Sequence, residues 1–171
     1  MVPATAKKIS RRAPGVLSVE QTQDLALVEH MLSAAGMFAG GLQAPGGCYL
    51  FAYVGDDIAG VIGIEACVDA ALLRSLMVAN PMRRRGIGGA LVAAARTAGH
   101  TRGARTLYAL APDPDAVHYL ARFGFTQVPP ADLIAALTGT FLVDHLRERP
   151  EELARHRTMS LDISNDGVIL R

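Results

Sequence analysis

A bend rich in arginine and glycine, residues 83–89, joins an apolar run to an alanine-rich stretch with helical spacing. The apolar run, residues 71–78, predicts a strand, and the stretch after the bend predicts a helix with one narrow apolar face: Leu91, Ala94, Ala95 and Ala98. A helix N-terminus presents free backbone N–H groups and a partial positive charge, and glycines let an anion come close because they lack a Cβ atom. The bend therefore predicts a phosphate site, with Arg83, Arg84 and Arg85 at its rim.

Strand and helix signals alternate along the rest of the chain. Strands are predicted at residues 15–19, 48–54, 58–65, 105–111, 125–128 and 157–163. Further helices are predicted from Thr22 as N-cap to Gly36, from Asp113 as N-cap to Gly124, and at residues 131–137 and 141–149, and the helix after the bend should end at Gly99 and Gly103. This order predicts one α+β domain with a mixed sheet at residues 15–163, between tails at residues 1–14 and 164–171.

The composition limits the classes of partner. Hydrophobic residues make up 50% of the chain, charged residues 19%, and the formal net charge is +1. Neither a generally basic nucleic-acid binder nor a strongly acidic protein is expected from these values. No apolar run reaches the roughly 18 residues of a membrane span, and no apolar segment follows the basic residues near the start, as a secretory signal would require. We therefore expect a cytoplasmic protein without nucleic-acid or membrane partners.

The two cysteines, Cys48 and Cys67, have neither the spacing of metal ligands nor the density of a disulfide framework. Buried free thiols are the simpler interpretation, in line with the usual state of intracellular proteins. No metal site is expected from the sequence.

Several phosphate-containing ligands compete for the bend. A Walker loop requires Lys-Ser or Lys-Thr after its glycines, which is missing. A dinucleotide-binding turn requires a third glycine where Leu91 stands, and an acidic residue about 20 positions further on, which is also missing. An RNA backbone could contact three arginines, but four tyrosines, five phenylalanines and no tryptophan provide few stacking platforms. Coenzyme A is the fourth candidate.

The motifs around the bend resemble those of the GCN5-related N-acetyltransferases. Leu76-Met77-Val78 followed by Arg83-Arg84-Arg85-Gly86-Ile87-Gly88 is similar to the family's strand end and cofactor-binding turn, and residues 119–125 are similar in part to its aromatic helix end. The resemblance covers residues 16–128 and implies a mixed, mostly antiparallel sheet that splays between its fourth and fifth strands and is flanked by helices. Residues 69–78 and 104–133 are further similar to the small acetyltransferases associated with bacterial arsenic resistance.

The resemblance implies transfer of an acetyl group from acetyl-CoA to the amine of a small molecule, such as an amino-acid-like toxin. Coenzyme A would contact Leu76, Met77, Val78, Arg83, Arg84, Arg85, Gly86, Ile87, Gly88, Gly89 and Asp113, with its pyrophosphate on the amides of residues 84–89. An N–H group near Val78 would stabilise the oxyanion of the tetrahedral intermediate. A homodimer is compatible with the resemblance. A non-catalytic acyl-CoA-binding or interaction module stays open as the alternative function.

Four polar residues on or beside the predicted strands are candidates for contact with the acceptor amine. Glu65 ends one strand and is the first candidate for the general base, ahead of Asp69 in the following turn. Arg74 interrupts an apolar run, which is costly unless its charge has a partner. That partner is either a substrate anion or a carboxylate of Glu65 or Asp69. Ser75 faces away from Arg74 unless a β-bulge intervenes.

The sequence departs from the family at one position. Many members place a tyrosine in the aromatic helix to protonate the leaving thiolate, but that position is Leu120 here, and Tyr119 points about 100° away around the helix. We therefore predict that Tyr119→Phe keeps turnover within about tenfold, because general acid catalysis is typically worth 10²–10⁴-fold. Steady-state kinetics with acetyl-CoA would check this, and a thousandfold loss of kcat at unchanged stability would contradict it.

Overall fold

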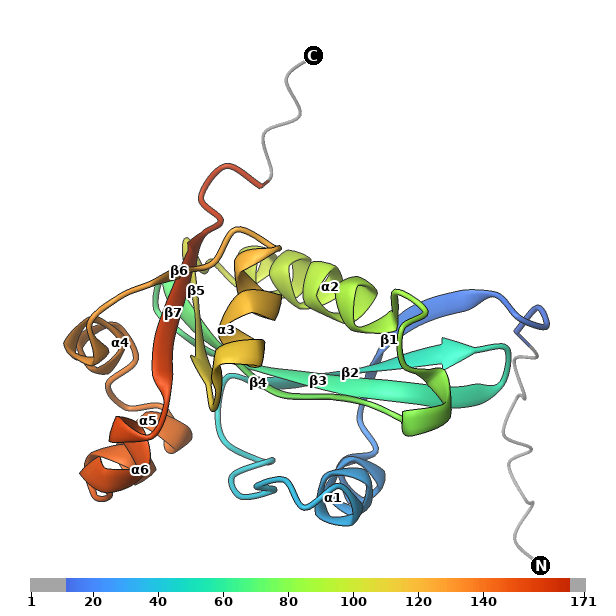
Figure 1. The fold of residues 1–171 in the computed structure, drawn as a ribbon, viewed down its shortest axis with the longest axis horizontal. Coiled ribbons are helices and arrows are strands. Elements are labelled where there is room, and N and C mark those ends of the chain that lie inside the picture. Colours follow the sequence, from blue (N-terminus) through green and yellow to red (C-terminus); the bar gives the residue numbers. More distant parts are fainter. Residues whose placement is uncertain (1–11, 167–171) are drawn as a thin grey trace, which may run out of the picture.

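The computed structural model describes residues 12–166, which form a seven-stranded sheet in the order β1-β2-β3-β4-β5-β7-β6 (Figure 1). The strands are β1 (Leu17–Thr22), β2 (Gly47–Val54), β3 (Asp57–Cys67), β4 (Ala70–Val78), β5 (Thr106–Ala111), β6 (Thr126–Gln127) and β7 (Arg157–Asp162). The helices are α1 (Leu25–Ala34), the 3-10 helix η1 (Asn80–Met82), α2 (Ile87–Thr101), α3 (Pro114–Ala121), α4 (Pro130–Ala136), α5 (Phe141–Arg147) and α6 (Pro150–Ala154).

The sheet is mixed. Strands β1 to β4 form an antiparallel meander, β5 pairs with β4 in parallel, and β7 pairs antiparallel with both β5 and β6. The parallel pairing follows from α2, which carries the chain from the end of β4 back to the start of β5. The predicted α+β fold with a mixed, mostly antiparallel sheet is confirmed.

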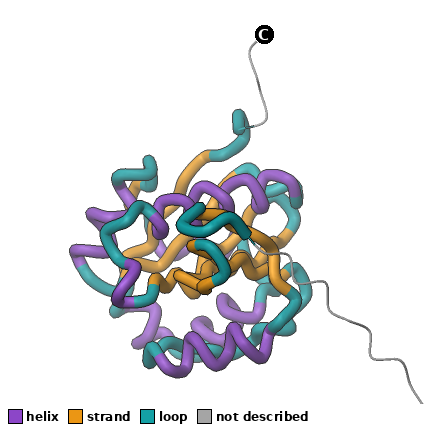
Figure 2. The backbone as a smooth tube through the Cα atoms, turned by 90° about the vertical axis from the view of Figure 1, so that its right-hand side faces the viewer, coloured by secondary structure: helices purple, strands orange, loops and turns teal. Residues whose placement is uncertain are grey.

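Helices cover both faces of the sheet, as the strands lying between helical layers in Figure 2 show. Helices α2 and α3 pack on one face, where Ala71 and Leu73 of β4 join a core with Leu91 and Leu107. On the other face, α1 packs over β2 and β3, and Leu72 of β4 packs against α4 and α5. Neighbouring residues of β4 thus face different cores, as the alternation of a strand requires.

Helix α2 lies close to the sheet because its inner face is small. Gly99 was predicted to end this helix, but it lies within it, and the helix continues to Thr101. A Cβ atom on Gly99 would lie 3.0 Å from the side chain of Leu107. The glycine is therefore explained by the close approach of α2 to β5 rather than by helix termination.

Strands β4 and β5 pair only over part of their length. Their register runs from Ala70 opposite Thr106 to Leu73 opposite Ala109, although β4 continues to Val78 and β5 to Ala111. A β-bulge lies directly after the paired segment: Gly63 of β3 faces Arg74 and Val61 faces Met77, which leaves one more residue on β4 than on β3. Ser75 in this bulge has a φ of 59°, a left-handed conformation that turns the strand.

Three local predictions need correction. Thr22 ends β1, and Asp24 caps α1 by accepting a hydrogen bond from the Leu27 N–H group at 3.0 Å. Helix α6 was not predicted, because it is only five residues long and lies among charged residues. The strand predicted at residues 125–128 is reduced to the two residues of β6.

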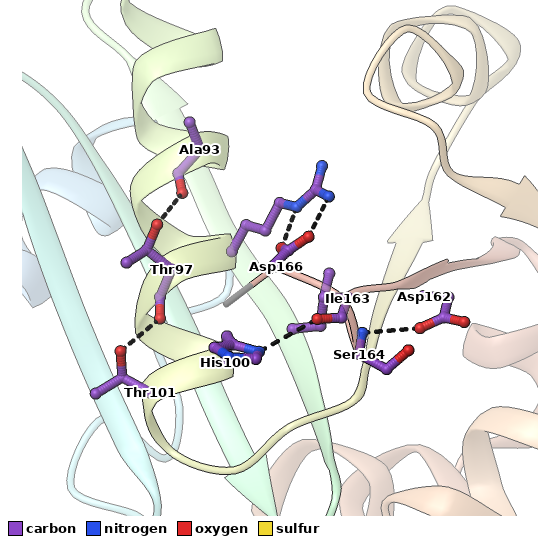
Figure 3. Close-up of polar contacts among 9 residues, drawn as sticks. Ala93, Thr97, His100, Thr101, Asp162, Ile163, Ser164 and Asp166 are labelled. Carbon is purple, nitrogen blue, oxygen red and sulfur yellow. Dashed lines mark hydrogen bonds and ion pairs between the residues drawn. The ribbon is translucent and has the colours of Figure 1, made fainter. Parts of the chain in front are cut away.

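The end of the described chain is fastened to α2 (Figure 3). The His100 ring contacts the carbonyl oxygen of Ile163 at 3.2 Å, and the Arg96 guanidinium forms a two-pronged ion pair with Asp166. Asp166 of the predicted C-terminal tail thus contacts the domain, while residues 1–11 and 167–171 lie outside the described residues.

The ion pair gives Asp166 a pH-dependent role. The hydrogen bonds from Arg96 lower the pKa of this carboxyl group, so its contribution to stability is present above the usual aspartate pKa and is lost as the pH falls through the lowered value. We expect Asp166→Asn to reduce the free energy of unfolding by less than about 1 kcal/mol at pH 7, because the pair is partly exposed. The difference in urea denaturation should shrink below about pH 4, and a difference that persists there would contradict this role.

Candidate active site

A glycine cradle forms at the predicted bend. Gly86 is the N-cap of α2 with a φ of 78°, and Arg84 before it also has a positive φ, of 62°. These conformations turn the chain sharply at the helix N-terminus, where the first N–H groups have no helical acceptor. A cavity of about 590 Å³ opens there, lined by Leu76, Val78, Arg83, Arg84, Gly86, Ile87, Gly88, Gly89, Tyr119, Arg122 and Phe123.

Tyr119 closes one side of the cradle. A Cβ atom on Gly88 would collide with the Tyr119 hydroxyl group, so glycine allows this ring to lie on the first turn of α2. The ring also packs edge-to-face on Phe123, with centroids 5.1 Å apart. Burial raises the pKa of the Tyr119 phenol, and the charge of Arg122 opposes this in part. The hydroxyl group is therefore protonated at neutral pH.

The end of β4 presents free backbone groups beside the cradle. The Ala79 N–H group donates to the Ala59 carbonyl on β3 at 2.9 Å, and backbone groups of successive strand residues point to opposite sides. The amide of Val78 therefore points away from β3, towards the side from which β5 has diverged. The Val78 carbonyl accepts a hydrogen bond from Arg83 Nε at 3.1 Å, in agreement with this direction.

A second cavity, which we call the chamber, opens beside the end of the paired segment of β4. It has a volume of about 480 Å³ and lies between the loop after α1, the strands β4 and β5, and the α5–α6 segment. Its wall is mostly apolar, with a group of polar side chains on one side. The lining residues are Met37, Phe38, Leu72, Leu73, Arg74, Ser75, Leu110, Leu142, His145, Leu146, Arg149, Glu152 and His156.

A third cavity of about 340 Å³, which we call the passage, lies between the two at the divergence of β4 and β5. It shares Leu76 and Tyr119 with the cradle. With the chamber it shares Met37, Leu73, Arg74, Ser75, Leu110 and His156. The lining of the passage thus includes residues of the cradle, on the face of α2 and α3, and residues of the chamber, on the face of α1 and α5.

Arg74 and Glu65 form a buried ion pair beside the chamber. Arg74 Nη1 lies 3.3 Å from Glu65 Oε2, and the side chains are 4% and 1% exposed. Arg74 Nη2 also donates to the Gly40 carbonyl at 2.6 Å, and the other Glu65 oxygen accepts from the Phe141 N–H group. The pair therefore ties β3 and β4 to the loop after α1 and to α5. The sequence left two kinds of partner open for Arg74, a substrate anion or a protein carboxylate. In the structure its partner is the carboxylate of Glu65.

The other predicted site residues fall into two groups. Leu76, Val78, Arg83, Arg84 and residues 86–89 meet in the cradle, and the bulge brings Ser75 to the same cavities as Arg74. Three residues lie elsewhere. The Met77 side chain packs in the α1 core, Arg85 contacts the Met82 sulfur, and Asp113 caps α3 by accepting from the Ala116 N–H group at 2.7 Å.

Sequence reasoning missed the polar side of the chamber. His145, Arg149, Glu152 and His156 come from α5, α6 and the residues beside them, where no chemistry was predicted. A signal was present, because His145 and Arg149, and likewise Glu152 and His156, are four positions apart, the spacing of one helical face. In the structure Arg149 Nη1 lies 3.1 Å from His145 Nδ1, and His156 Nδ1 lies 2.7 Å from the backbone carbonyl oxygen of Glu152.

Residues 12–166 contain no group of three or more histidine, cysteine, aspartate or glutamate side chains arranged to hold a metal ion. Within the same residues, no helix combines the length and the apolar character needed to cross a bilayer.

Comparison with known proteins assigns the family. The profile of the acetyltransferase (GNAT) family matches residues 17–125, more than half of the chain. The chain therefore belongs to the GNAT family of acetyltransferases. A comparison with curated proteins finds no match.

Solved structures show the same fold at low sequence identity. Rv2747 from Mycobacterium tuberculosis, in complex with CoA and NLQ, has a TM-score of 0.63 at 16% identity, over 86% of this chain and 98% of that one. The ribosomal-protein-S18-alanine N-acetyltransferase from Escherichia coli has a TM-score of 0.60 at 17% identity, over 91% and 99%. N-acetylglutamate synthase from Neisseria gonorrhoeae, complexed with coenzyme A and N-acetyl-glutamate, has a TM-score of 0.64 at 14% identity, over 88% of this chain and 36% of that one.

The buried ion pair generates a stability prediction. Glu65→Gln leaves the Arg74 charge buried without its counter-charge, so we expect a loss of about 3–5 kcal/mol in the free energy of unfolding. The double variant Glu65→Gln/Arg74→Met removes both charges and should lose less than the sum of the two single variants. Urea denaturation of all four proteins measures this coupling. Strictly additive losses would contradict a direct interaction between the two charges.

Proposed function

We propose that the protein is an N-acetyltransferase that moves the acetyl group of acetyl-CoA to the amine of a small molecule. The observation that carries this proposal is the passage at the divergence of β4 and β5, because it lies between a helix N-terminus suited to a phosphate group and the chamber. A donor anchored in the cradle could present its thioester in the passage to an amine in the chamber. The coenzyme A in related structures supports this choice of donor.

In this proposal the pyrophosphate lies on the amides of residues 84–89, and Arg83 moves from the Val78 carbonyl to a phosphate oxygen. The pantetheine arm runs along Leu76 and Val78, whose backbone groups β5 leaves free. The Val78 N–H group then stabilises the oxyanion of the tetrahedral intermediate, and one such donor is typically worth about 3 kcal/mol. Tyr119 lies where the cradle meets the passage, close to the place of the leaving thiolate.

The chamber suits an amine on an apolar body. Phe38 lines the chamber, and the rings of Phe38 and Phe141, which are 49% and 40% exposed, have centroids 4.9 Å and 6.1 Å from the His145 ring. Because Arg74 is already paired with Glu65, a carboxylate on the substrate would have to pair with Arg149 instead. A narrower form of this proposal is that the acceptor substrate is an amino-acid-like toxin.

The ion pair also changes the role that we propose for Glu65. Both carboxylate oxygens have partners and the side chain is buried, so an incoming amine does not reach it. We propose that Glu65 positions Arg74 and the start of α5, and that another group accepts the proton.

The cofactor site can be tested by charge. Gly88→Glu places a negative charge in the cradle and a side chain against the Tyr119 hydroxyl group, so we expect acetyl-CoA binding in calorimetry to be lost, together with acetyl transfer. Ala93→Glu is the matched control, because it adds the same charge on the exposed side of α2 and should leave binding unchanged. Circular dichroism checks that both variants fold.

Two results would contradict the proposal. Undiminished acetyl-CoA binding by a folded Gly88→Glu variant would place the cofactor elsewhere. Acetyl-CoA binding without thioester consumption, against a panel of primary amines with apolar bodies, would favour a non-catalytic binding module.

A further inference from the structure

An alkyl amine is almost entirely protonated at neutral pH. With a pKa near 10, about one molecule in a thousand is neutral at pH 7. Acyl transfer needs the neutral amine, so a proton has to leave on the side of the passage from which the amine approaches. The polar side chains that line the passage are the candidates for its acceptor.

Only four polar side chains line the passage among the described residues: Arg74, Ser75, Tyr119 and His156. Arginine stays protonated in proteins and has no lone pair to offer. The serine hydroxyl is not a base at neutral pH, and burial raises the pKa of the Tyr119 phenol, which keeps it protonated. Imidazole is the remaining group that can accept a proton near neutral pH.

The hydrogen bonds of His156 fix which ring nitrogen is free. Its Nδ1 lies 2.7 Å from the carbonyl oxygen of Glu152, and a carbonyl oxygen only accepts, so Nδ1 carries the hydrogen. In the neutral ring the lone pair is then on Nε2. No described residue hydrogen-bonds this nitrogen, and the side chain lines both the passage and the chamber.

The second histidine of the chamber is arranged in the opposite way. Arg149 Nη1 lies 3.1 Å from His145 Nδ1, and because a guanidinium only donates, the His145 lone pair is already used. Its Nε2 carries the hydrogen and lies 3.7 Å from the Glu152 carboxylate. His145 is also absent from the lining of the passage. The two histidines of the chamber are thus not equivalent.

We propose that His156 accepts the proton of the acceptor amine through Nε2, an inference that rests on the acetyltransferase function proposed above. The Glu152 carbonyl holds the ring through Nδ1, so that Nε2 is available where the chamber meets the passage. The other charged or titratable groups around the chamber and passage are Arg74, Tyr119, His145, Arg149 and Glu152.

The reaction balances with these groups. The substrate ammonium gives one proton to His156 Nε2, and the neutral amine attacks the thioester carbonyl with its lone pair to form the C–N bond. The C–S bond then breaks, the electron pair leaves with sulfur as a thiolate, and the nitrogen loses its second proton to water. His156 returns its proton, through water, to the thiolate, so the products are the amide and free coenzyme A.

The test compares His156→Asn with the parent protein, using acetyl-CoA and 2-phenylethylamine. Asparagine places its amide near the Nδ1 position and can still donate to the Glu152 carbonyl, but it has no group at Nε2. We expect kcat/KM for the amine to fall by about 10²–10⁴-fold at pH 7, with acetyl-CoA binding unchanged. His118→Asn, an exposed histidine on α3, is the matched control and should behave as the parent.

The pH profile separates a proton acceptor from a merely structural residue. From neutral pH up to the pKa of the amine, the parent should show a nearly flat kcat/KM, because one proton is lost within the complex. The variant should instead gain about tenfold per pH unit, because it depends on the free neutral amine. The pH dependence of kcat/KM can also be measured on the parent protein alone. If the parent's kcat/KM itself rises tenfold per pH unit, the proposal is overturned, whether or not the variant folds.

Two further outcomes separate the role of His156 from the proposed function. A folded His156→Asn protein within threefold of the parent at pH 7 overturns the role of His156 but leaves the acetyltransferase function standing. A parent protein that binds acetyl-CoA and acetylates no amine overturns the proposed function, and this inference with it.

Discussion

The divergence of β4 from β5 is the constraint on which the rest of the site depends. The two strands pair for only four residues, up to Leu73 and Ala109. Directly after this point, Ser75 adopts a left-handed conformation and β4 bulges against β3. The bulge keeps β4 hydrogen-bonded on one side while its other side loses a partner. An opening through the sheet results, and the backbone beside it is free to bind a ligand.

Each end of this opening is built in a different way. The cradle is built from residues that are close in sequence: the end of β4, the bend and the first turn of α2. Tyr119 of α3 covers one side of it. The chamber is assembled from the loop after α1, both diverging strands and the α5–α6 segment. The Arg74–Glu65 pair holds these distant parts together, because it also contacts Gly40 and Phe141.

This difference explains what the sequence could predict. The cradle was predictable because its parts are close in sequence, and the glycines and arginines between an apolar strand and a helix have few other uses. The chamber was not, because its residues meet only through long-range packing, and α6 is too short to give a clear period. The partner of Arg74 stayed open for the same reason: the register that sets Glu65 opposite Leu72, and Gly63 opposite Arg74, is not visible before the hairpin is built. The role of Gly99 depended likewise on the approach of α2 to Leu107.

A crystal structure with coenzyme A bound would show whether the gap between β4 and β5 connects a phosphate cradle with an acceptor chamber. We expect the pyrophosphate on the amides of residues 84–89, the pantetheine arm along Leu76 and Val78, and the thiol at the passage, between Tyr119 and His156. A pyrophosphate bound away from the α2 N-terminus, or a thiol directed out of the passage into solvent, would contradict this expectation.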